Sequence, residues 1–121
     1  MKQTIFLVED NEHIRENTVE LLELSNYTVI PACNGKEALD IALRQAPNLI
    51  LCDIQMPEMN GYSLLEHIRQ HPALNESRFV FFTASTEKKE IDAGMQMGAD
   101  GYIVKPFTGE HLLEVLKKNL G

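Results

Sequence analysis

A short apolar run near the middle of the chain limits the folds that are open to it. Leu49 to Cys52 are four apolar residues in a row, and the run ends in Asp53, with Pro57 and the pair Asn60-Gly61 close behind. A short run without polar alternation is typical of a strand that is buried on both faces, as in a parallel sheet. Asp53 would then stand at the carboxyl end of a central strand, where open α/β sheets bind their ligands. Taken alone, however, this residue is more simply interpreted as the cap of the following turn.

Four further apolar runs, at residues 4–8, 28–30, 78–82 and 101–104, alternate with segments of helical periodicity at about 11–25, 34–46, 61–71, 86–97 and 108–120. Five strands that alternate with five helices predict an α/β fold, with right-handed crossovers, a parallel sheet and helices on both of its faces. No linker interrupts the pattern, so we expect one domain over residues 1–121.

Several element ends carry their own signals. Asn11, Asn34 and Thr108 stand where helix N-caps are expected, because their side chains can accept hydrogen bonds from the first helical turn. Gly98 is expected to end the fourth helix in a left-handed conformation. Pro31 is expected to end the second strand.

Composition excludes several classes of function. The net charge of −7 argues against binding of nucleic acid or anionic membrane by this domain. The two cysteines, Cys33 and Cys52, lie in apolar runs without metal-site spacing, and we expect both to be reduced and buried. Neither a signal-peptide pattern nor a run of membrane-spanning length is present, so a cytoplasmic protein is expected.

Chemically complementary side chains follow four of the five predicted strands. The first strand ends in Glu9 and Asp10, the third in Asp53, the fourth in Thr83 and the fifth in Lys105. The carboxyl ends of parallel strands lie along one edge of a sheet, so these five side chains are expected to share one pocket. Three neighbouring carboxylates repel one another unless a cation compensates them, and oxygen ligands suit Mg²⁺ or, in its place, Mn²⁺.

A metal ion and a lysine around one carboxylate are what phosphoryl transfer to that carboxylate requires, because the transition state spreads negative charge over the phosphoryl oxygens. Asp53 would be the nucleophile and would form an aspartyl phosphate. Each residue also has a simpler interpretation: an acidic pair at a helix N-terminus, a strand threonine, a surface lysine. Four strand ends that complement one another by chance are a much less economical explanation.

The chain resembles the receiver domain of bacterial two-component response regulators, in particular the single-domain chemotaxis regulators. The resemblance covers the whole length and rests on Val8-Glu9-Asp10-Asn11, on the segment from Asp53 to Gly61, on Thr83-Ala84 and on the segment from Gly98 to Phe107. It implies a doubly wound, flavodoxin-like (βα)5 sheet in the strand order 2-1-3-4-5. It also implies a signalling protein that is not a conventional enzyme, although it assists its own phosphorylation and dephosphorylation.

By this resemblance, Asp53 takes a phosphoryl group from the phosphohistidine of a histidine kinase or a histidine phosphotransfer protein. Asp10 and Asp53 would bind Mg²⁺ directly, together with the backbone carbonyl of Gln55, and Glu9 would act through water. Lys105 would pair with Asp53 and then with the phosphoryl group. The Lys105-Pro106 bond is a candidate cis peptide.

The resemblance also implies a switch. Thr83 and Tyr102 match the family's switch pair, which would alter the face of the fourth helix, fifth strand and fifth helix and so reach a downstream effector or output domain. Gln55 and Ser85 would tune the lifetime of the phosphoryl group, and the small Ala84 would keep the site open.

Three other kinds of protein share parts of this pattern. A phosphatase of the haloacid dehalogenase type needs an acid two residues after its nucleophile, where this chain has Gln55. A flavodoxin-like cofactor protein needs a phosphate-binding loop after the first strand, where Glu9, Asp10 and Glu12 would repel phosphate. A degenerate receiver would act as a phosphorylation-independent interaction domain, which the intact set of site residues argues against.

Overall fold

Five strands form one parallel sheet in the computed structural model, which describes residues 2–56, 58–84 and 87–120. They are β1 (Thr4–Val8), β2 (Thr28–Ala32), β3 (Leu49–Cys52), β4 (Arg78–Thr83) and β5 (Gly101–Val104). Their order is β2-β1-β3-β4-β5, as the resemblance implied, and the chain is a doubly wound α/β protein of the flavodoxin-like type.

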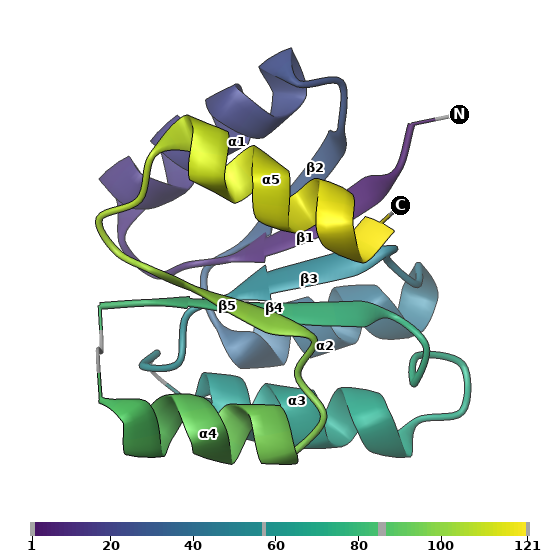
Figure 1. Cartoon of the computed structure of the whole chain (residues 1–121). Helices are drawn as coiled ribbons and strands as arrows, with labels where there is room; N and C mark the ends of the chain where they lie inside the picture. Colours follow the sequence, from purple (N-terminus) through teal and green to yellow (C-terminus); the bar gives the residue numbers. More distant parts are fainter. Residues whose placement is uncertain (1, 57, 85–86, 121) are drawn as a thin grey trace.

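Helices follow each strand and cover both faces of the sheet: α1 (Glu12–Leu24), α2 (Gly35–Arg44), α3 (Gly61–Gln70), α4 (Lys88–Gln96) and α5 (Gly109–Leu120). Figure 1 shows α1 and α5 on one face and α2, α3 and α4 on the other. None of the helices in the described ranges is long and apolar enough to cross a membrane.

The alternation of side chains along the strands divides the core into two layers. Alternate residues of the three central strands face α1 and α5, namely Ile5, Leu7, Leu49, Leu51, Val80 and Phe82. Their neighbours face the other three helices, namely Phe6, Val8, Ile50, Cys52, Phe79 and Phe81. All four residues of β3 are buried, which confirms the strand that the sequence indicated.

The predicted caps are in place. Asn11 accepts a hydrogen bond from Ile14 N at 3.0 Å, Asn34 from Glu37 N at 2.8 Å, and the Thr108 hydroxyl from His111 N at 3.0 Å. Gly98 ends α4 with φ of +107°. Asn60, expected in a turn, also caps α3 through Ser63 N at 2.9 Å.

Three expectations about element ends were wrong or incomplete. β2 continues through Pro31 to Ala32, because it is an edge strand and a proline there can leave its missing N–H on the open side. Cys33 is exposed rather than buried, because it lies beyond the end of β2 in the bend before α2. α4 begins at Lys88 and not at Thr86, which lies outside the described residues.

Candidate functional site

The sheet itself places the predicted site residues side by side. Backbone hydrogen bonds continue past the strand ends, from Asp53 N to Val8 O at 3.1 Å and from Lys105 N to Thr83 O at 2.8 Å. Asp53 and Lys105, each the first residue after its strand, are therefore hydrogen-bonded to the neighbouring strand like the strand residues themselves. β1, β3, β4 and β5 thus bring Glu9, Asp53, Thr83 and Lys105 to one edge, as the alternating pattern predicted.

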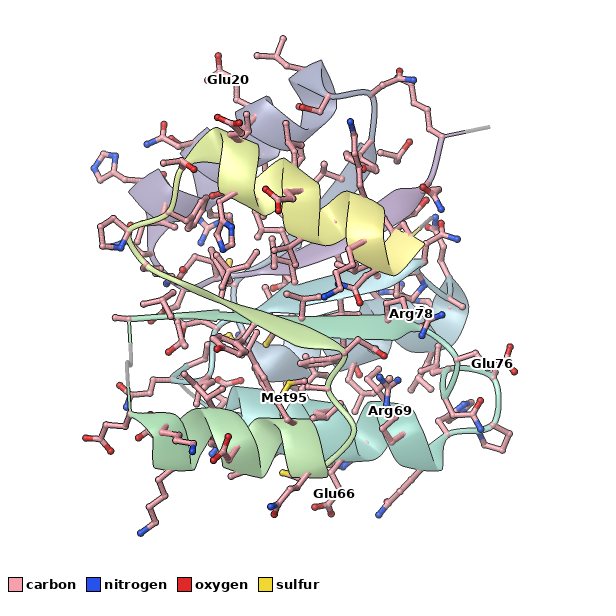
Figure 2. All side chains as sticks on the ribbon, in the orientation of Figure 1. Glu20, Glu66, Arg69, Glu76, Arg78 and Met95 are labelled. Atoms are coloured by element: carbon pink, nitrogen blue, oxygen red, sulfur yellow. The ribbon has the colours of Figure 1, made fainter. Side chains whose placement is uncertain are left out.

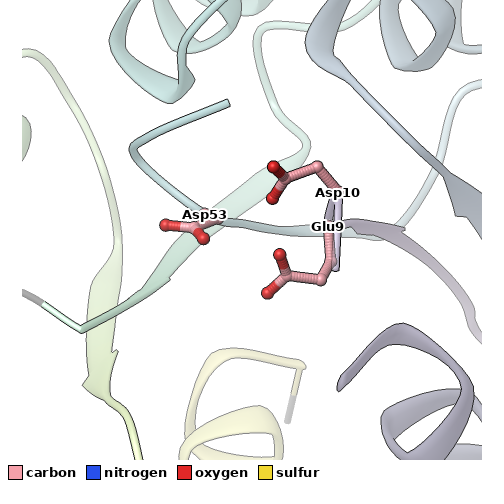
Figure 3. A group of neighbouring side chains, drawn as sticks. All are labelled: Glu9, Asp10 and Asp53. Carbon is pink, nitrogen blue, oxygen red and sulfur yellow. The ribbon is translucent and has the colours of Figure 1, made fainter. Parts of the chain in front are cut away.

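Three carboxylates converge at this edge. One oxygen each of Glu9, Asp10 and Asp53 lies within 4.8 Å of the other two, and Figure 3 shows Glu9 and Asp10 extending toward Asp53. They differ in exposure: the side chain of Glu9 is 1% exposed and that of Asp53 is 13% exposed, while Asp10 is an exposed residue. Solvent therefore reaches the cluster from the side of Asp10 and Asp53.

Lys105 neutralises part of this negative charge. Its Nζ donates to Asp53 Oδ2 at 2.9 Å and also to Glu9 Oε1. Burial alone would lower the pKa of Lys105, but the hydrogen bonds and charges of Glu9 and Asp53 outweigh it and raise the pKa above its usual value. Lys105 is therefore firmly protonated, and it pairs with Asp53 as the resemblance implied.

Glu9 is the buried member of the cluster. Burial raises its pKa, against the hydrogen bonds from Lys105 and from Asn11 N. With one oxygen bound to Lys105 and the other accepting from Asn11 N at 3.1 Å, Glu9 has less capacity for a direct metal ligand bond than its two neighbours. Asp10 and Asp53 are the more accessible oxygen ligands.

The loop after β3 fixes the position of Asp53. Asp53 Oδ1 accepts from Gln55 N at 3.3 Å, and Gly61 N donates to Ile54 O at 2.8 Å. A Cβ atom at Gly61 would lie 2.5 Å from Asp53 O, so this glycine permits the start of α3 to pack directly against the strand end. Gln55 itself is exposed at the rim.

The other predicted site residues occupy different surroundings. Thr83 is 2% exposed at the end of β4, whereas Tyr102 on β5 is 43% exposed and lies outside the pocket. Ala84 is exposed beside Lys105, and Ser85 lies outside the described residues. The Lys105-Pro106 peptide bond is cis, as the resemblance suggested.

Two residues of the site were not predicted. Arg15 donates from Nη1 to Glu9 O at 2.8 Å and so ties α1 to the acidic loop. The ring of Phe82 lies under the ammonium group of Lys105, 4.5 Å from Nζ to the ring centre. The two-residue alternation in β4 does predict that Phe82 lies on the side of α1 and α5. Its contact with Lys105 could not be predicted, because it depends on the direction of the lysine side chain.

An apolar hollow borders the site on the side of α1. It has a volume of about 600 Å³ and lies between α1 and the segment that joins β5 to α5. Its lining includes Ile14, Leu21, Phe107 and Pro106, and it reaches Ala84 and Lys105. Apolar surface thus adjoins the charged pocket directly.

Comparisons with known proteins agree with this geometry. The family profile described as the response regulator receiver domain matches residues 5–117. The polar-differentiation response regulator DivK of Brucella anthropi is 35% identical over 121 residues, which are 100% of this chain and 98% of that protein. The probable transcriptional regulator ycf27 of Porphyridium aerugineum is 34% identical over 111 residues, which are 92% of this chain but only 45% of that protein.

Among solved structures, the chemotaxis protein CheY4 of Vibrio cholerae superposes with a TM-score of 0.94 at 29% identity, covering 99% of this chain and 100% of that one. Receiver domains are the signalling domains of two-component systems. They change state when they are phosphorylated, and they bind Mg²⁺ at an acidic pocket. From its sequence, its strand order and its acidic cluster, the chain belongs to the family of response regulator receiver domains.

Proposed function

We propose that this chain, as a receiver domain over residues 1–121, is a switch in which Asp53 accepts a phosphoryl group from the phosphohistidine of a histidine kinase or phosphotransfer protein. The observation that carries the proposal is the placement of Asp53 between two kinds of partner. Lys105 Nζ lies 2.9 Å from one of its oxygens, and the carboxylates of Glu9 and Asp10 lie within 4.8 Å of it. A carboxylate in these surroundings can be both a nucleophile and a metal ligand.

The donor set fits Mg²⁺, with Mn²⁺ as a substitute, because every side-chain ligand is a carboxylate oxygen and the site is open on one side. Asp10, Asp53 and the backbone carbonyl of Gln55 would hold the ion, and Glu9 would contact it through water. When bound, the ion would offset negative charge on the transferring phosphoryl oxygens.

In the transfer itself, an oxygen of Asp53 forms the new bond to phosphorus while the bond from phosphorus to the histidine nitrogen breaks. Lys105 is placed to exchange its contact with Asp53 for one with a phosphoryl oxygen, and its cationic charge stabilises the transition state. Ala84 has no bulk that would obstruct the incoming group. Gln55 and Ser85 would set how readily water reaches the product.

The response would depend on Thr83 and Tyr102. In the structure, Tyr102 on β5 is partly exposed while Thr83 is buried at the end of β4. Movement of the Thr83 hydroxyl to a phosphoryl oxygen would open space for Tyr102 to turn inward, and the α4–β5–α5 face would then favour a downstream effector or output domain. This is a shift between two populations that a local charge change biases.

The phosphodonor has to cover the sheet edge in order to reach Asp53, so the apolar hollow beside Lys105 is the natural place for its contact. Ile14, Leu21 and Phe107 offer aliphatic and aromatic surface there, as expected at the core of a protein interface.

The net charge of −7 argues against a direct role of this domain in nucleic-acid or membrane binding. We also propose a cytoplasmic location.

Incubation with Mg²⁺ and acetyl phosphate, followed by intact mass measurement, tests the proposal. A gain of one phosphoryl group that is abolished in Asp53→Asn, and by chelation of Mg²⁺ in the wild type, is the expected result. The matched control is Asp92→Asn, an exposed aspartate on α4, which should behave as the wild type does. Absence of any gain at every Mg²⁺ concentration would favour the degenerate receiver instead.

A further inference from the structure

α1 has two flanks that face different surroundings. Helical geometry turns 100° per residue, which places Ile14 and Leu21 on the flank toward α5 and Glu16, Val19 and Glu23 on the opposite flank. The first flank borders the hollow beside Lys105. The second flank lies on the other side of α1 from this hollow, toward the outer side of the edge strand β2, and it borders a separate groove.

This second groove combines an apolar floor with an acidic rim. Its volume is about 480 Å³; we call its apolar lining residues Val19, Leu24 and Pro31 the floor and its glutamates Glu16, Glu20 and Glu23 the rim. Leu24 is 80% exposed, the largest exposed fraction among the big apolar side chains of the described residues. Figure 2 shows Glu20 directed away from the rest of the molecule into solvent. An apolar floor that remains this open is typical of a docking surface.

No ion pair of the described residues balances the charge of the rim. Among the ion pairs of residues 2–56, 58–84 and 87–120, none involves Glu16, Glu20 or Glu23. Arg15, which also lines the groove, turns its guanidinium to the backbone oxygen of Glu9 at 2.8 Å instead. Like charges three and four residues apart on a helix destabilise it, so the free chain carries a cost that a cationic partner would relieve.

The groove also excludes several occupants. Pro31 lacks an N–H, so the outer edge of β2 is a poor template for an added strand. Nucleic acid and anionic lipid would be repelled by the glutamates. A second copy of this chain has a net charge of −7 and is disfavoured for the same reason. A basic amphipathic helix remains. Its apolar side chains would match the floor of the groove, and its positive charges would match the acidic rim.

We propose that this groove docks a basic amphipathic helix of a partner protein, with Lys or Arg side chains opposite Glu16, Glu20 and Glu23 and a Leu or Ile side chain on the apolar floor. The three glutamates are spaced over seven residues of α1, about 10 Å along its axis at 1.5 Å per residue. Positive side chains at positions i, i+4 and i+7 of the partner match this spacing. The groove lies on the flank of α1 opposite the hollow beside Lys105, and Asp53 is not among its lining residues, so docking there needs no phosphorylation.

The probe for this inference is a synthetic helical peptide with Lys at i, i+4 and i+7 and Leu at the neighbouring i+3 position, and its matched control carries Glu in place of each Lys. Binding is measured by fluorescence anisotropy, and the site is mapped by amide chemical shifts of the labelled receiver domain. We expect the shifts to concentrate on residues 16–24 and 28–32, binding to weaken as salt rises, and the Glu-containing peptide not to bind.

Variants separate this groove from general attraction to an acidic protein. Replacing Glu16, Glu20 and Glu23 together by Gln should weaken binding at least about tenfold, and so should Leu24→Ser, whose exposed position leaves the fold intact. The matched controls are Glu110→Gln with Glu114→Gln, an exposed acidic pair on α5, and Leu43→Ser, at a side chain 52% exposed on α2. The controls, and Asp53→Asn, should bind as the wild type does.

Two results would overturn the inference. One is equal weakening in the α5 control and in the triple variant, which would mean non-specific attraction. The other is a concentration-dependent dimer in sedimentation that Leu24→Ser abolishes, which would make a second copy the occupant. Because the assay contains neither a phosphodonor nor Mg²⁺, failure here leaves the test of Asp53 phosphorylation unaffected.

Discussion

In the described part of the molecule, Lys105 is the only cationic side chain that forms ion pairs with Glu9 and Asp53. Its replacement by Met leaves Glu9, at 1% exposure, without its cationic partner. Breaking a buried ion pair by removing one partner costs about 3–5 kcal/mol, so we expect Lys105→Met to lower the free energy of unfolding by about 3 kcal/mol in Mg²⁺-free buffer. Urea unfolding at neutral pH measures this.

Lys118→Met is the matched control, because Lys118 is exposed near the end of α5 and should change stability by less than about 0.5 kcal/mol. If the two variants unfold at the same urea concentration, Lys105 does not compensate Glu9 to a significant degree.

Gly61 provides a second test at the scale of one residue. A Cβ atom here would lie 2.5 Å from Asp53 O and 3.0 Å from both Ile54 Cα and a ring carbon of Phe81. Alanine normally favours a helix by about 1 kcal/mol over glycine, but two of these three neighbours are backbone atoms that cannot yield cheaply. We therefore expect Gly61→Ala to destabilise the protein and to slow phosphorylation by acetyl phosphate, because Asp53 has to move.

The comparison for Gly61→Ala is Gly101→Ala, whose added Cβ would meet nothing nearer than 3.5 Å. It should phosphorylate at the wild-type rate. A wild-type rate in Gly61→Ala as well would show that the strand end tolerates the displacement.

At the scale of elements, the sequence predicted best what depends on neighbouring residues. The buried strand Leu49–Cys52 and the caps at Asn11 and Asn34 follow from local patterns, whereas the strand order and the pairing of Lys105 with Asp53 came from the family resemblance. The contacts of Arg15 and Phe82 with the site depend on side-chain directions across different elements, which no local pattern encodes.

The contact between α3 and α4 also depends on side-chain directions across different elements. It leads to a prediction about pH dependence. The hydroxyl of Tyr62 on α3 donates to Glu90 O on α4 at 2.9 Å, and burial, followed by the charge of Glu90, raises the pKa of Tyr62 above its ordinary value of 10.0. The folded state therefore holds this proton more tightly than the unfolded chain does. Stability should fall as pH rises above 10.0, until the raised pKa is passed.

Tyr62→Phe removes this titration and the hydrogen bond together. At neutral pH it should cost about 1 kcal/mol, the usual net value of such a bond. Its stability should also decline less steeply than that of the wild type between about pH 9 and 11, measured by urea unfolding alongside the phenolate absorbance difference. Tyr102→Phe, at an exposed side chain, should change neutral-pH stability by less than about 0.5 kcal/mol. Parallel pH profiles of wild type and Tyr62→Phe would contradict the assignment.

On the scale of the whole molecule, the two ends of the sheet differ: stabilising ion pairs lie at one end, and the proposed phosphorylation site lies at the other. At the end opposite the acidic cluster, Asp100 accepts hydrogen bonds from Arg69 Nη2 at 2.9 Å and from Phe79 N at 2.8 Å, and Arg69 also donates to Gly98 O. Figure 2 shows Arg69 and Arg78 at this end of the molecule. There, two arginines pair with one aspartate, whereas at the carboxyl edge one lysine pairs with two of the three clustered acids of the described residues.

This difference between the two ends of the sheet predicts opposite effects of two aspartate substitutions on stability. Asp100→Ala removes the carboxylate that accepts from Arg69 Nη2 and from Phe79 N, and it should lower the free energy of unfolding by about 2–3 kcal/mol, while the gain in stability on adding Mg²⁺ stays as in the wild type. Asp10→Asn removes one of three repelling charges, so in Mg²⁺-free buffer it should be at least as stable as the wild type.

Magnesium then distinguishes the two ends of the sheet. A ligand at a hundred times its Kd stabilises the folded state by about 2.7 kcal/mol, and we expect a gain of this size in the wild type and in Asp100→Ala but not in Asp10→Asn. Urea unfolding of the three proteins with and without Mg²⁺ gives the comparison. A full gain in Asp10→Asn would place the ion away from the Glu9, Asp10 and Asp53 cluster, and a lost gain in Asp100→Ala would mean that the two ends are coupled through the sheet.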